Sequence, residues 1–554
     1  MSGNYRPRRR YGTSGNAKSP VGKSDAGQAN GTGTGASART RRPRTADPRR
    51  IAYDVLAAVR ERAAYANLLL PRLLAERGLT GRDAALATEL AYGTLRGQGT
   101  YDAILSACSD RPLDKLDPPV LDVLRLGAHQ LLNTRIGAHA AVATSVDLAK
   151  SVVGPRVSGY VNAVLRRVAT RDLDAWLDIV APSPASDPNG YLATRYSHPR
   201  WIVAAYRAAL GDAAGTPAQA TAVPGPPGDG DARDPEAAGA AAVTELEAAL
   251  AAGNARPRVT LAAFPAGPPR EDVMPADADP GRWSPYAFTL RSGDPAPLIE
   301  SGAAAVQDEG SQLAAIALAR APVTPRPGQG YAGPERWLDM CAGPGGKSRL
   351  LYGLAQEPRA TLTAAELHSH RAALVRDVLT RASRLAASGV PARGEDTGDL
   401  GAPEPSGTQG TEFEVIVADG TRPPWPDSAF DRVLVDVPCT GLGALRRRPE
   451  ARWRKSENDL KELTALQRDL LRSALASVRP GGVVAYVTCS PVPAETSEVV
   501  ADVVASARDV DILDAPALLS GVPGTCAADP RLAQLWPHRH GTDAIFIALL
   551  RRAT

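Results

Sequence analysis

Two of the five cysteines stand where a thiol could do chemistry. Cys439 lies in DVPCTGLG and Cys489 in YVTCS, and each follows a short apolar run that predicts a buried strand ending in a loop. The thiolate is the nucleophilic form of cysteine, so such loops favour covalent or acid–base chemistry. Buried structural thiols are one alternative. A dithiol redox protein is another, but the two cysteines lack CxxC spacing.

A glycine-rich run, LDMCAGPGGKS from Leu338 to Ser348, predicts a strand, a tight turn and a helix that begins near Gly346. Glycines let the backbone approach a ligand closely, and a helix start offers free N–H groups to an anion. The run has neither the GxxxxGK[ST] spacing of a phosphate-binding loop nor a GxGxxG fingerprint. A purely structural turn remains the alternative.

Carboxylates stand at or just after the ends of later predicted strands. Glu366 ends the second strand, Asp419 follows the third in ADGTRP, and Asp436 ends the fourth. A carboxylate in the second position can accept both ribose hydroxyls of an adenosine-bearing ligand, and Asp419 would then lie on the adenine side. Each carboxylate could equally cap a helix.

The elements that position these groups alternate between strand and helix from Glu335 onward. This alternation predicts an α/β domain with a mainly parallel sheet, whose ligands bind at the carboxyl edge. The predicted strands are Trp337 to Met340, Thr361 to Glu366, Val415 to Ala418, Arg432 to Asp436, Val483 to Val487 and Ala544 to Leu550.

The region before this domain reads as helical. Asp47-Pro48 predicts a helix start, and apolar residues then recur at helical spacing. Further helices are predicted at Leu86 to Leu95, Val120 to Leu132, Val142 to Val152 and Gly159 to Val168. A helix is also expected to open in SHPRWIV (Ser197 to Val203) and another in VQDEGSQLAAIAL (Val306 to Leu318), with a strand at Arg258 to Phe264.

Composition divides the chain into four parts. Residues 1–46 predict a disordered basic tail, because Met1 to Arg50 holds twelve Lys and Arg against two Asp and Glu, whereas the whole chain has a net charge of only +4. Residues 47–180 predict a helical bundle, and residues 181–330 a linker and small α/β region with an insert at about 213–242. Residues 331–554 predict the α/β domain, with an insert at about 389–411.

Several classes are disfavoured. No run reaches the roughly 18 apolar residues of a membrane span, and the N-terminus lacks a secretory apolar segment. Five widely spaced cysteines do not make a disulfide framework, so we expect a reducing cytoplasm. No Cys/His cluster has metal-ligand spacing, so no metal is expected.

The order of these motifs resembles the RsmB/Sun group of bacterial 16S rRNA cytosine methyltransferases, within the NOL/NOP/Sun family. The motifs that carry it are LDMCAGPGGKS, Glu366, ADG, DVPCTGLG, RRRPEARW, LQRDLL, RPGG and YVTCS. The segments AAVATSVDLAK and GYVNAVLRRV resemble the NusB-type RNA-binding domain. The resemblance runs from about Asp47 to the C-terminus. It implies a multidomain protein: an all-α NusB-like bundle, then a class I (Rossmann-like) α/β domain dependent on S-adenosylmethionine.

The resemblance also implies roles for the site. Carbon 5 of cytosine becomes nucleophilic once a thiolate adds to carbon 6, and Cys489 would be that nucleophile while Cys439 assists product release. Asp436 would contact the base edge and Lys347 would supply positive charge. The cofactor would be held by Cys341, Ala342, Gly343, Pro344, Gly345, Gly346, Lys347, Glu366, Asp419 and Asp436. Because DNA cytosine methyltransferases carry the nucleophile in a PC motif, the residues alone leave the two thiol roles open.

Two positions depart from the family pattern: Glu366 stands where Asp is usual, and residues 542–546 read TDAIF where DGFF is expected. RNA contacts are predicted from basic residues on a helix and beside the Cys439 loop, namely Arg166, Arg167, Arg446, Arg447, Arg448 and Arg452. The expected partner is 16S rRNA, bound by a monomer. The alternatives are the same chemistry on tRNA or another rRNA site, and a catalytically idle NusB-like assembly factor.

Overall fold

The computed structural model describes residues 47–211, 244–325, 334–387 and 411–554. The predicted tail of residues 1–46 and the predicted inserts, apart from Thr411, lie outside the described residues.

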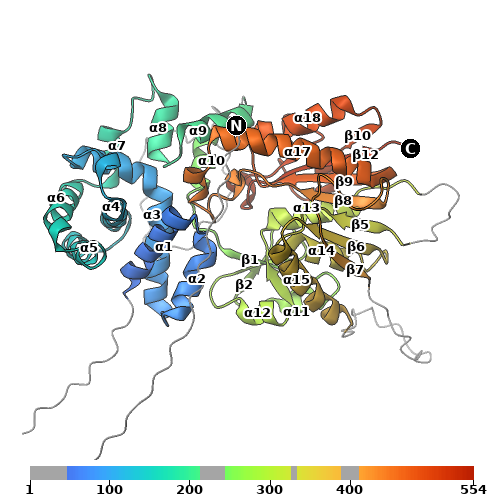
Figure 1. Ribbon diagram of the computed structural model, residues 1–554, viewed down its shortest axis with the longest axis horizontal. Helices are drawn as coiled ribbons and strands as arrows, with labels where there is room; N and C mark the ends of the chain where they lie inside the picture. Colours follow the sequence, from blue (N-terminus) through green and yellow to red (C-terminus); the bar gives the residue numbers. More distant parts are fainter. Residues whose placement is uncertain (1–46, 212–243, 326–333, 388–410) are drawn as a thin grey trace, which may run out of the picture. The chain divides into compact units, whose positions relative to one another are not determined.

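The first described region is a helical bundle (Figure 1). Its α1 begins as predicted, because Asp47 accepts a hydrogen bond from the Arg49 backbone N–H and Pro48 occupies the first turn. The apolar faces of the helices share one core. The bundle consists of α1 (Pro48–Arg62), α2 (Ala66–Glu76), α3 (Gly81–Cys108), α4 (Pro118–Asn133), α5 (Ala138–Val152), α6 (Ser158–Val168) and α7 (Leu173–Val180).

A connecting region carries a small antiparallel sheet of strand order β2-β3-β1-β4. Helix α13 starts three residues later than the predicted Val306, because Val306 still belongs to β4 and Asp308 caps the helix. The elements are α8 (Pro188–Arg195), α9 (Arg200–Leu210), α10 (Glu245–Ala252), β1 (Val259–Ala263), α11 (Arg270–Val273), β2 (Ala278–Pro280), β3 (Ala287–Leu290), α12 (Ala296–Glu300), β4 (Ala304–Val306) and α13 (Glu309–Arg320).

The remaining residues form a large sheet of strand order β10-β12-β9-β8-β5-β6-β7, with β11 beside β12. Strands β5 to β9 run parallel, and β12 is antiparallel to β9. All six predicted strands are confirmed: β5 (Arg336–Asp339), β6 (Thr361–Glu366), β7 (Phe413–Val417), β8 (Phe430–Asp436), β9 (Val478–Thr488) and β12 (Phe546–Arg552). The short strands β10 (Val510–Leu513) and β11 (Ala533–Gln534) were not predicted.

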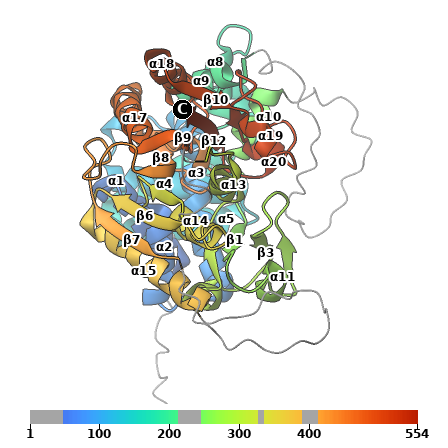
Figure 2. The ribbon, with the colours of Figure 1, turned by 90° about the vertical axis from the view of Figure 1, so that its right-hand side faces the viewer.

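Helices cover both faces of this sheet, as Figure 2 shows. One face packs against α13, α14 (Gly346–Leu354) and α15 (Ser369–Ala387), and the other against α17 (Glu457–Ser477) and α18 (Ser497–Ser506). The chain winds from β5 outward to β7 and then returns to β8 on the other side of β5. Ligands of such sheets bind at this reversal, outside the carboxyl ends of β5 and β8. None of the described helices is long and apolar enough to cross a membrane.

Candidate active site

The two thiols meet at the carboxyl edge of the sheet. Cys439, after β8, and Cys489, after β9, have their Sγ atoms 3.3 Å apart, and both side chains are partly exposed. The hydrogen bond from the Cys439 S–H lowers the pKa of Cys489, although burial opposes this shift. The same bond raises the pKa of Cys439 well above its usual value. With Cys439 as the donor, these shifts correspond to a thiolate on Cys489 and a proton on Cys439, and the distance between the sulfurs allows either one to donate.

A fully buried carboxylate holds the Cys439 loop. Glu495 accepts hydrogen bonds from the Thr440 backbone N–H at 2.7 Å and from the Thr440 hydroxyl, and a third from Gln467 Nε2 at 3.1 Å. Gln467 Nε2 also donates to the Pro438 carbonyl oxygen at 2.9 Å. Neither Glu495 nor Gln467 was predicted as a site residue, because their contact with this loop depends on residues distant in the sequence.

The Cys489 loop is fixed from its other side by a glycine. The Gly443 N–H donates to the Cys489 carbonyl oxygen at 2.8 Å, and the Gly443 carbonyl oxygen accepts from the Ala544 N–H at 3.0 Å. A Cβ atom at Gly443 would lie 2.1 Å from the Ala544 oxygen. Residue 443 must therefore be glycine for the two loops to approach each other.

An ion pair lies beside the thiols. Lys347 Nζ in the first turn of α14 donates to Asp436 Oδ2 at 2.7 Å and to Ser311 Oγ at 3.4 Å. Burial alone would lower the pKa of Lys347, but the Asp436 carboxylate outweighs it and the pKa is raised. Lys347 in turn stabilises the thiolate of Cys489. The predicted catalytic residues are thus brought together at one place.

The glycine-rich loop forms a cradle for a ligand. Helix α14 begins at Gly346 as predicted, and Gly345 has a φ of 107°, which an L side chain rarely adopts. The Gly343 N–H donates to Glu366 Oε2 at 3.1 Å, and a Cβ atom at Gly343 would lie 2.3 Å from that oxygen. Gln307, beside Gly346, has a buried Nε2 for which the described residues offer no hydrogen-bond acceptor. An amide donor in that state suits the carboxylate of an amino-acid ligand.

Two predicted carboxylates flank the cradle. Glu366 is 4 % exposed, at the end of β6, and accepts from His368 N–H at 3.0 Å as well as from the loop. A carboxylate has about four acceptor sites, so it can also accept ribose hydroxyls. Asp419 accepts from the backbone N–H and hydroxyl of Thr421 at 2.9 and 2.7 Å. Its position beyond β7 is as predicted, and its side chain closes the turn there.

Asp339 is a further residue that the sequence reading did not single out. It ends β5 beneath the cradle, is 1 % exposed, and accepts from the Ser348 hydroxyl at 2.7 Å. Burial raises the pKa of Asp339 to about 7. Asp339 could have been predicted from its position at the end of a strand before a glycine-rich turn, because the other carboxylates at strand ends were predicted in this way.

The prediction of a basic patch for RNA beside the Cys439 loop is wrong in part. Arg446 is not a free surface cation: it donates to Asp543 Oδ1 at 3.0 Å, to Asp308 Oδ2 at 2.8 Å and to the Gly541 carbonyl oxygen at 2.7 Å. Arg447 also pairs with Asp543. Because these carboxylates are nearly fully buried, they hold both guanidinium groups against the protein.

The prediction that Arg452 contacts RNA is wrong, because its side chain is fully buried. It donates to the Ser197 carbonyl oxygen at 3.0 Å, to Asn254 Oδ1 at 2.7 Å and to the Gly253 carbonyl oxygen at 3.1 Å. A side chain committed in this way holds the fold together and cannot contact RNA. Of the four, Arg448 is exposed, with its guanidinium 5.5 Å from the ring centroid of Tyr65.

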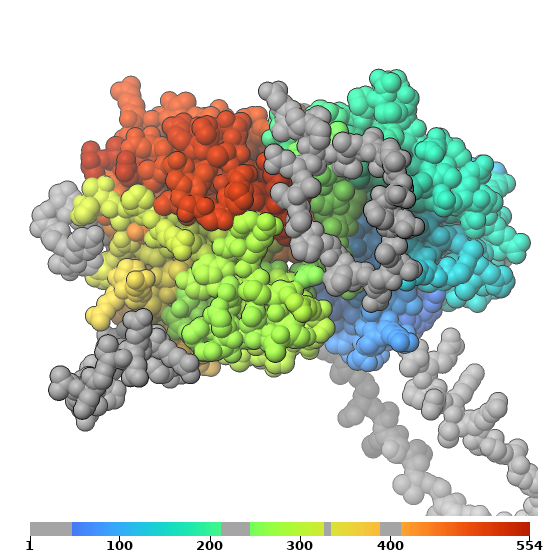
Figure 3. Space-filling model, turned by 180° about the vertical axis from the view of Figure 1, so that it is seen from behind, coloured from blue at the N-terminus to red at the C-terminus, as the bar shows by residue number. Residues whose placement is uncertain are grey.

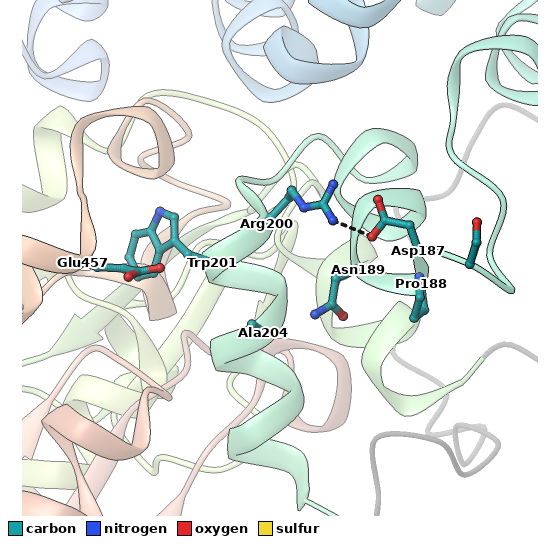
Figure 4. Close-up of a pocket in the computed structure, with 8 residues that line it drawn as sticks. Asp187, Pro188, Asn189, Arg200, Trp201, Ala204 and Glu457 are labelled. Carbon is teal, nitrogen blue, oxygen red and sulfur yellow. Dashed lines mark hydrogen bonds and ion pairs between the residues drawn. The ribbon is translucent and has the colours of Figure 1, made fainter.

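The two arginines of α6 are exposed, on the side away from the apolar stripe, as predicted. Arg167 pairs with Asp110 at 2.8 Å across the bundle surface. A separate recess of about 340 Å³ lies between α8, α9 and Glu457, where Arg200 pairs with Asp187 and the Trp201 ring lies toward Glu457 (Figure 4). It contains none of the residues described above, so we do not include it in the site.

Comparison with known proteins identifies both parts of the chain. Residues 331–390 and 407–551 match the family described as 16S rRNA methyltransferase RsmB/F, and residues 46–170 match the NusB family. A protein of Mycobacterium tuberculosis H37Rv, named as a methyltransferase without a substrate, is 46 % identical over 93 % of this chain and 98 % of its own. The ribosomal RNA small subunit methyltransferase B of Pseudomonas syringae is 30 % identical over 91 % of this chain and 96 % of its own.

The fold also has a relative of known structure. The crystal structure of PH0851 superposes with a TM-score of 0.65 at 20 % identity and covers 91 % of this chain and 99 % of its own. The predicted fold class, a helical NusB domain followed by an α/β methyltransferase domain, is confirmed. The chain belongs to the RsmB/F family of S-adenosylmethionine-dependent RNA cytosine-5 methyltransferases, with an N-terminal NusB domain.

Proposed function

We propose that this protein methylates carbon 5 of a cytosine in 16S rRNA through a covalent bond between Cys489 and the base. The observation that carries the proposal is the thiol pair, 3.3 Å apart, beside the ion pair of Lys347 and Asp436. We assign RNA binding to residues 47–180 and catalysis to residues 331–554. We also propose that the protein acts as a monomer in the cytoplasm, where thiols stay reduced.

The first step is addition of the Cys489 thiolate to carbon 6 of the cytosine. The electron pair of the 5,6 double bond moves toward the N3 side of the ring, which takes up a proton. Lys347 supplies this proton through the Asp436 carboxylate that it contacts at 2.7 Å. The adduct is an enamine, so carbon 5 is now nucleophilic. When bound, S-adenosylmethionine would be held by residues 341–347, Glu366, Asp419 and Asp436 and would supply an electrophilic methyl group. The bond from carbon 5 to this methyl would form as the methyl–sulfonium bond breaks, and the sulfur would leave as the thioether of S-adenosylhomocysteine.

The second step restores the aromatic base. The carbon 5 proton is removed, its electron pair re-forms the 5,6 double bond, and the bond between carbon 6 and sulfur breaks, returning Cys489 as a thiolate. We assign Cys439 to this step because its sulfur lies 3.3 Å from the leaving sulfur. The N3 proton returns to the Asp436–Lys347 pair and the carbon 5 proton ends in solvent, so each turnover releases one proton.

The choice of 16S rRNA rests on the relatives. Those from Pseudomonas syringae and Bacillus subtilis are named for the small ribosomal subunit, at 30 % and 28 % identity. The NusB domain with exposed Arg166 and Arg167, and the exposed Arg448 near the thiols, supply cations for RNA phosphates. The target base must leave its stack to reach the thiols, which favours a loop or single-stranded site.

The test is methylation of defined RNAs. The purified protein is incubated with S-adenosylmethionine carrying a labelled methyl group and with unmodified 16S rRNA, 23S rRNA or bulk tRNA, and digests are analysed by mass spectrometry. We expect labelled 5-methylcytidine in 16S rRNA only. Label in tRNA or 23S rRNA instead would reassign the substrate, and no label in any of these RNAs would favour the idle assembly factor.

Variants separate the two thiols. Cys489→Ala should abolish both methylation and adduct formation, whereas Cys439→Ala should accumulate a protein–RNA adduct that survives denaturing gels. Cys526→Ala is the matched control, because Cys526 is exposed and outside the site. If Cys489→Ala stays active while Cys439→Ala forms no adduct, the two roles are exchanged.

A further inference from the structure

A recess lined by three arginines lies between the small sheet and the methyltransferase domain. It has a volume of about 340 Å³ and is bounded by residues 281–285, the flank of α13, and residues 518–522. Figure 3 shows the face on which the small sheet (light green) adjoins the C-terminal part of the chain (red). The arginines are Arg270, Arg282 and Arg320, and none of the described residues that line the recess is acidic.

Two of these cations are available to a ligand. Arg282 and Arg320 are exposed, and within the described part of the chain neither pairs with a carboxylate. The Arg282 guanidinium lies 4.4 Å from the ring centroid of Trp283, which orients it at the wall of the recess. Arg270 pairs with Glu271, whose side chain is 65 % exposed, so this pair is weak. An uncompensated cluster of this kind attracts phosphate groups.

A carboxylate behind the recess wall is occupied by backbone donors. Glu309 is committed to the backbone of the recess wall, where it accepts from the Ser284 N–H at 2.6 Å and from the Trp283 N–H. The Ser284 hydroxyl donates to Gln312 at 2.7 Å. These bonds fix the wall to α13, so the recess is a built feature of the domain.

The recess and the thiols share structural elements. Ser311, in the first turn of α13, accepts from Lys347, and Leu313 and Arg320 of the same helix line the recess. Ser311 and Arg320 are nine residues apart, about 13 Å along the axis of a helix. On the other side, Trp283 Nε1 donates to the His540 carbonyl oxygen at 2.8 Å, next to the segment that pairs with Arg446. The Trp283 end of the recess therefore adjoins elements that carry the active site, whereas Arg320 lies at the far end of α13.

We propose that this recess binds the sugar–phosphate backbone of the substrate RNA near the target cytosine. Arg282 and Arg320 contact phosphate oxygens, and the Arg282–Trp283 pair provides a flat surface for the adjoining nucleotide. The inference rests on the proposed function, because it takes RNA as the substrate. It adds a contact outside both the NusB domain and the thiol site.

The test compares two doubly substituted proteins that each lose two positive charges. Arg282→Gln with Arg320→Gln removes the free cations of the recess. Arg472→Gln with Arg508→Gln is the control, because both residues are exposed, Arg472 in α17 and Arg508 in the loop that follows α18, and these two helices cover the opposite face of the sheet. RNA affinity is measured by fluorescence anisotropy at several salt concentrations, and S-adenosylmethionine binding by calorimetry verifies the fold.

Compared with the wild-type protein, the recess variant should bind about tenfold more weakly to a single-stranded fragment of the RNA that the wild-type protein methylates. The slope of log K against log salt should fall in magnitude by about 0.7 to 1.4, for one or two lost phosphate contacts. The control should keep the wild-type slope. Equal slopes in all three proteins would overturn the assignment of the recess to RNA binding and would leave the methylation result intact. Absence of methylation by the wild-type protein would instead refute the proposed function.

A small-anion site is the remaining outcome. Inorganic phosphate at millimolar concentration is titrated into the wild-type and recess-variant proteins in the same calorimeter. Phosphate binding that depends on Arg282 and Arg320, together with an unchanged RNA slope, would assign the recess to a free anion and overturn the RNA assignment.

Discussion

Replacing Arg452 should destabilise the protein far more than replacing an exposed arginine. Arg452→Ala removes a fully buried guanidinium and leaves three acceptors, on Ser197, Asn254 and Gly253, without donors. Unpaired buried acceptors cost about 1–3 kcal/mol each. Burial lowers the pKa of Arg452 to about 9, so relief of its desolvation offsets part of this loss. The net loss should be about 3–5 kcal/mol, because three lost hydrogen bonds to buried acceptors outweigh the relief of desolvation.

The assay is chemical denaturation followed by tryptophan fluorescence, with Arg472→Ala as the control. The Arg472 side chain is 51 % exposed and, among the described residues, pairs with Asp469 alone, so its loss should stay below about 0.5 kcal/mol. Arg452→Lys keeps the charge but not the two-pronged geometry, and should lose about 2 kcal/mol. Because the protein has several domains, each transition is fitted separately. A loss below about 1 kcal/mol for Arg452→Ala would refute the reasoning.

Three further predictions concern the active site. In Cys439→Ala the pKa of Cys489 should rise, so its alkylation by iodoacetamide, measured by mass spectrometry, should shift to higher pH; an unshifted profile would contradict the hydrogen bond. Glu495→Gln should lower kcat roughly 10–100-fold at unchanged S-adenosylmethionine affinity, because a carboxylate oxygen that holds Thr440 is lost. A wild-type kcat in this variant would exclude a role for Glu495 in positioning the Cys439 loop. The pKa of Asp339 is about 7 in the folded protein and near 3.8 in the unfolded chain. Between pH 3.8 and about 7 the folded state therefore holds a proton that the unfolded state has lost, so the free energy of unfolding falls as the pH rises through this range. Asp339→Asn should remove this fall, which denaturation at about pH 5 and pH 8 measures; an unchanged difference would contradict the raised pKa.

The strand ends were predictable because a buried parallel strand leaves a continuous apolar run in the sequence. The runs before Asp436 and Cys489 predicted β8 and β9, and neighbouring parallel strands place their carboxyl ends at one edge. The proximity of Cys439 to Cys489 follows from this topology. Their 3.3 Å separation does not, because it also depends on the Gly443 contact and on Glu495.

The arginines after Cys439 could not be assigned from the sequence. A run of charged residues usually forms a solvated face, and nothing nearby in the chain indicates otherwise. Arg452 is buried because its acceptors come from positions near 197 and 254, and Arg446 because its partners are Asp308 and Asp543. Helix α2 was not predicted either. Pro71 lies inside it, and Leu68 is 68 % exposed, so its apolar residues do not all face the core.

One segment of the chain, residues 439–454, carries a thiol at its start and a domain contact at its end. Past Cys439, Gly443 binds the backbone of Cys489. Farther on, Glu450 accepts from the backbone N–H of Ala66 at 3.2 Å, and Arg454 donates to the carbonyl oxygen of Ala64, both in the helical domain. The segment is therefore held near both ends, at the thiol pair and at the helical domain. We expect a change in the position of the helical domain to be transmitted through this segment to the loop that carries Cys439, because the contacts at its two ends leave few residues between them.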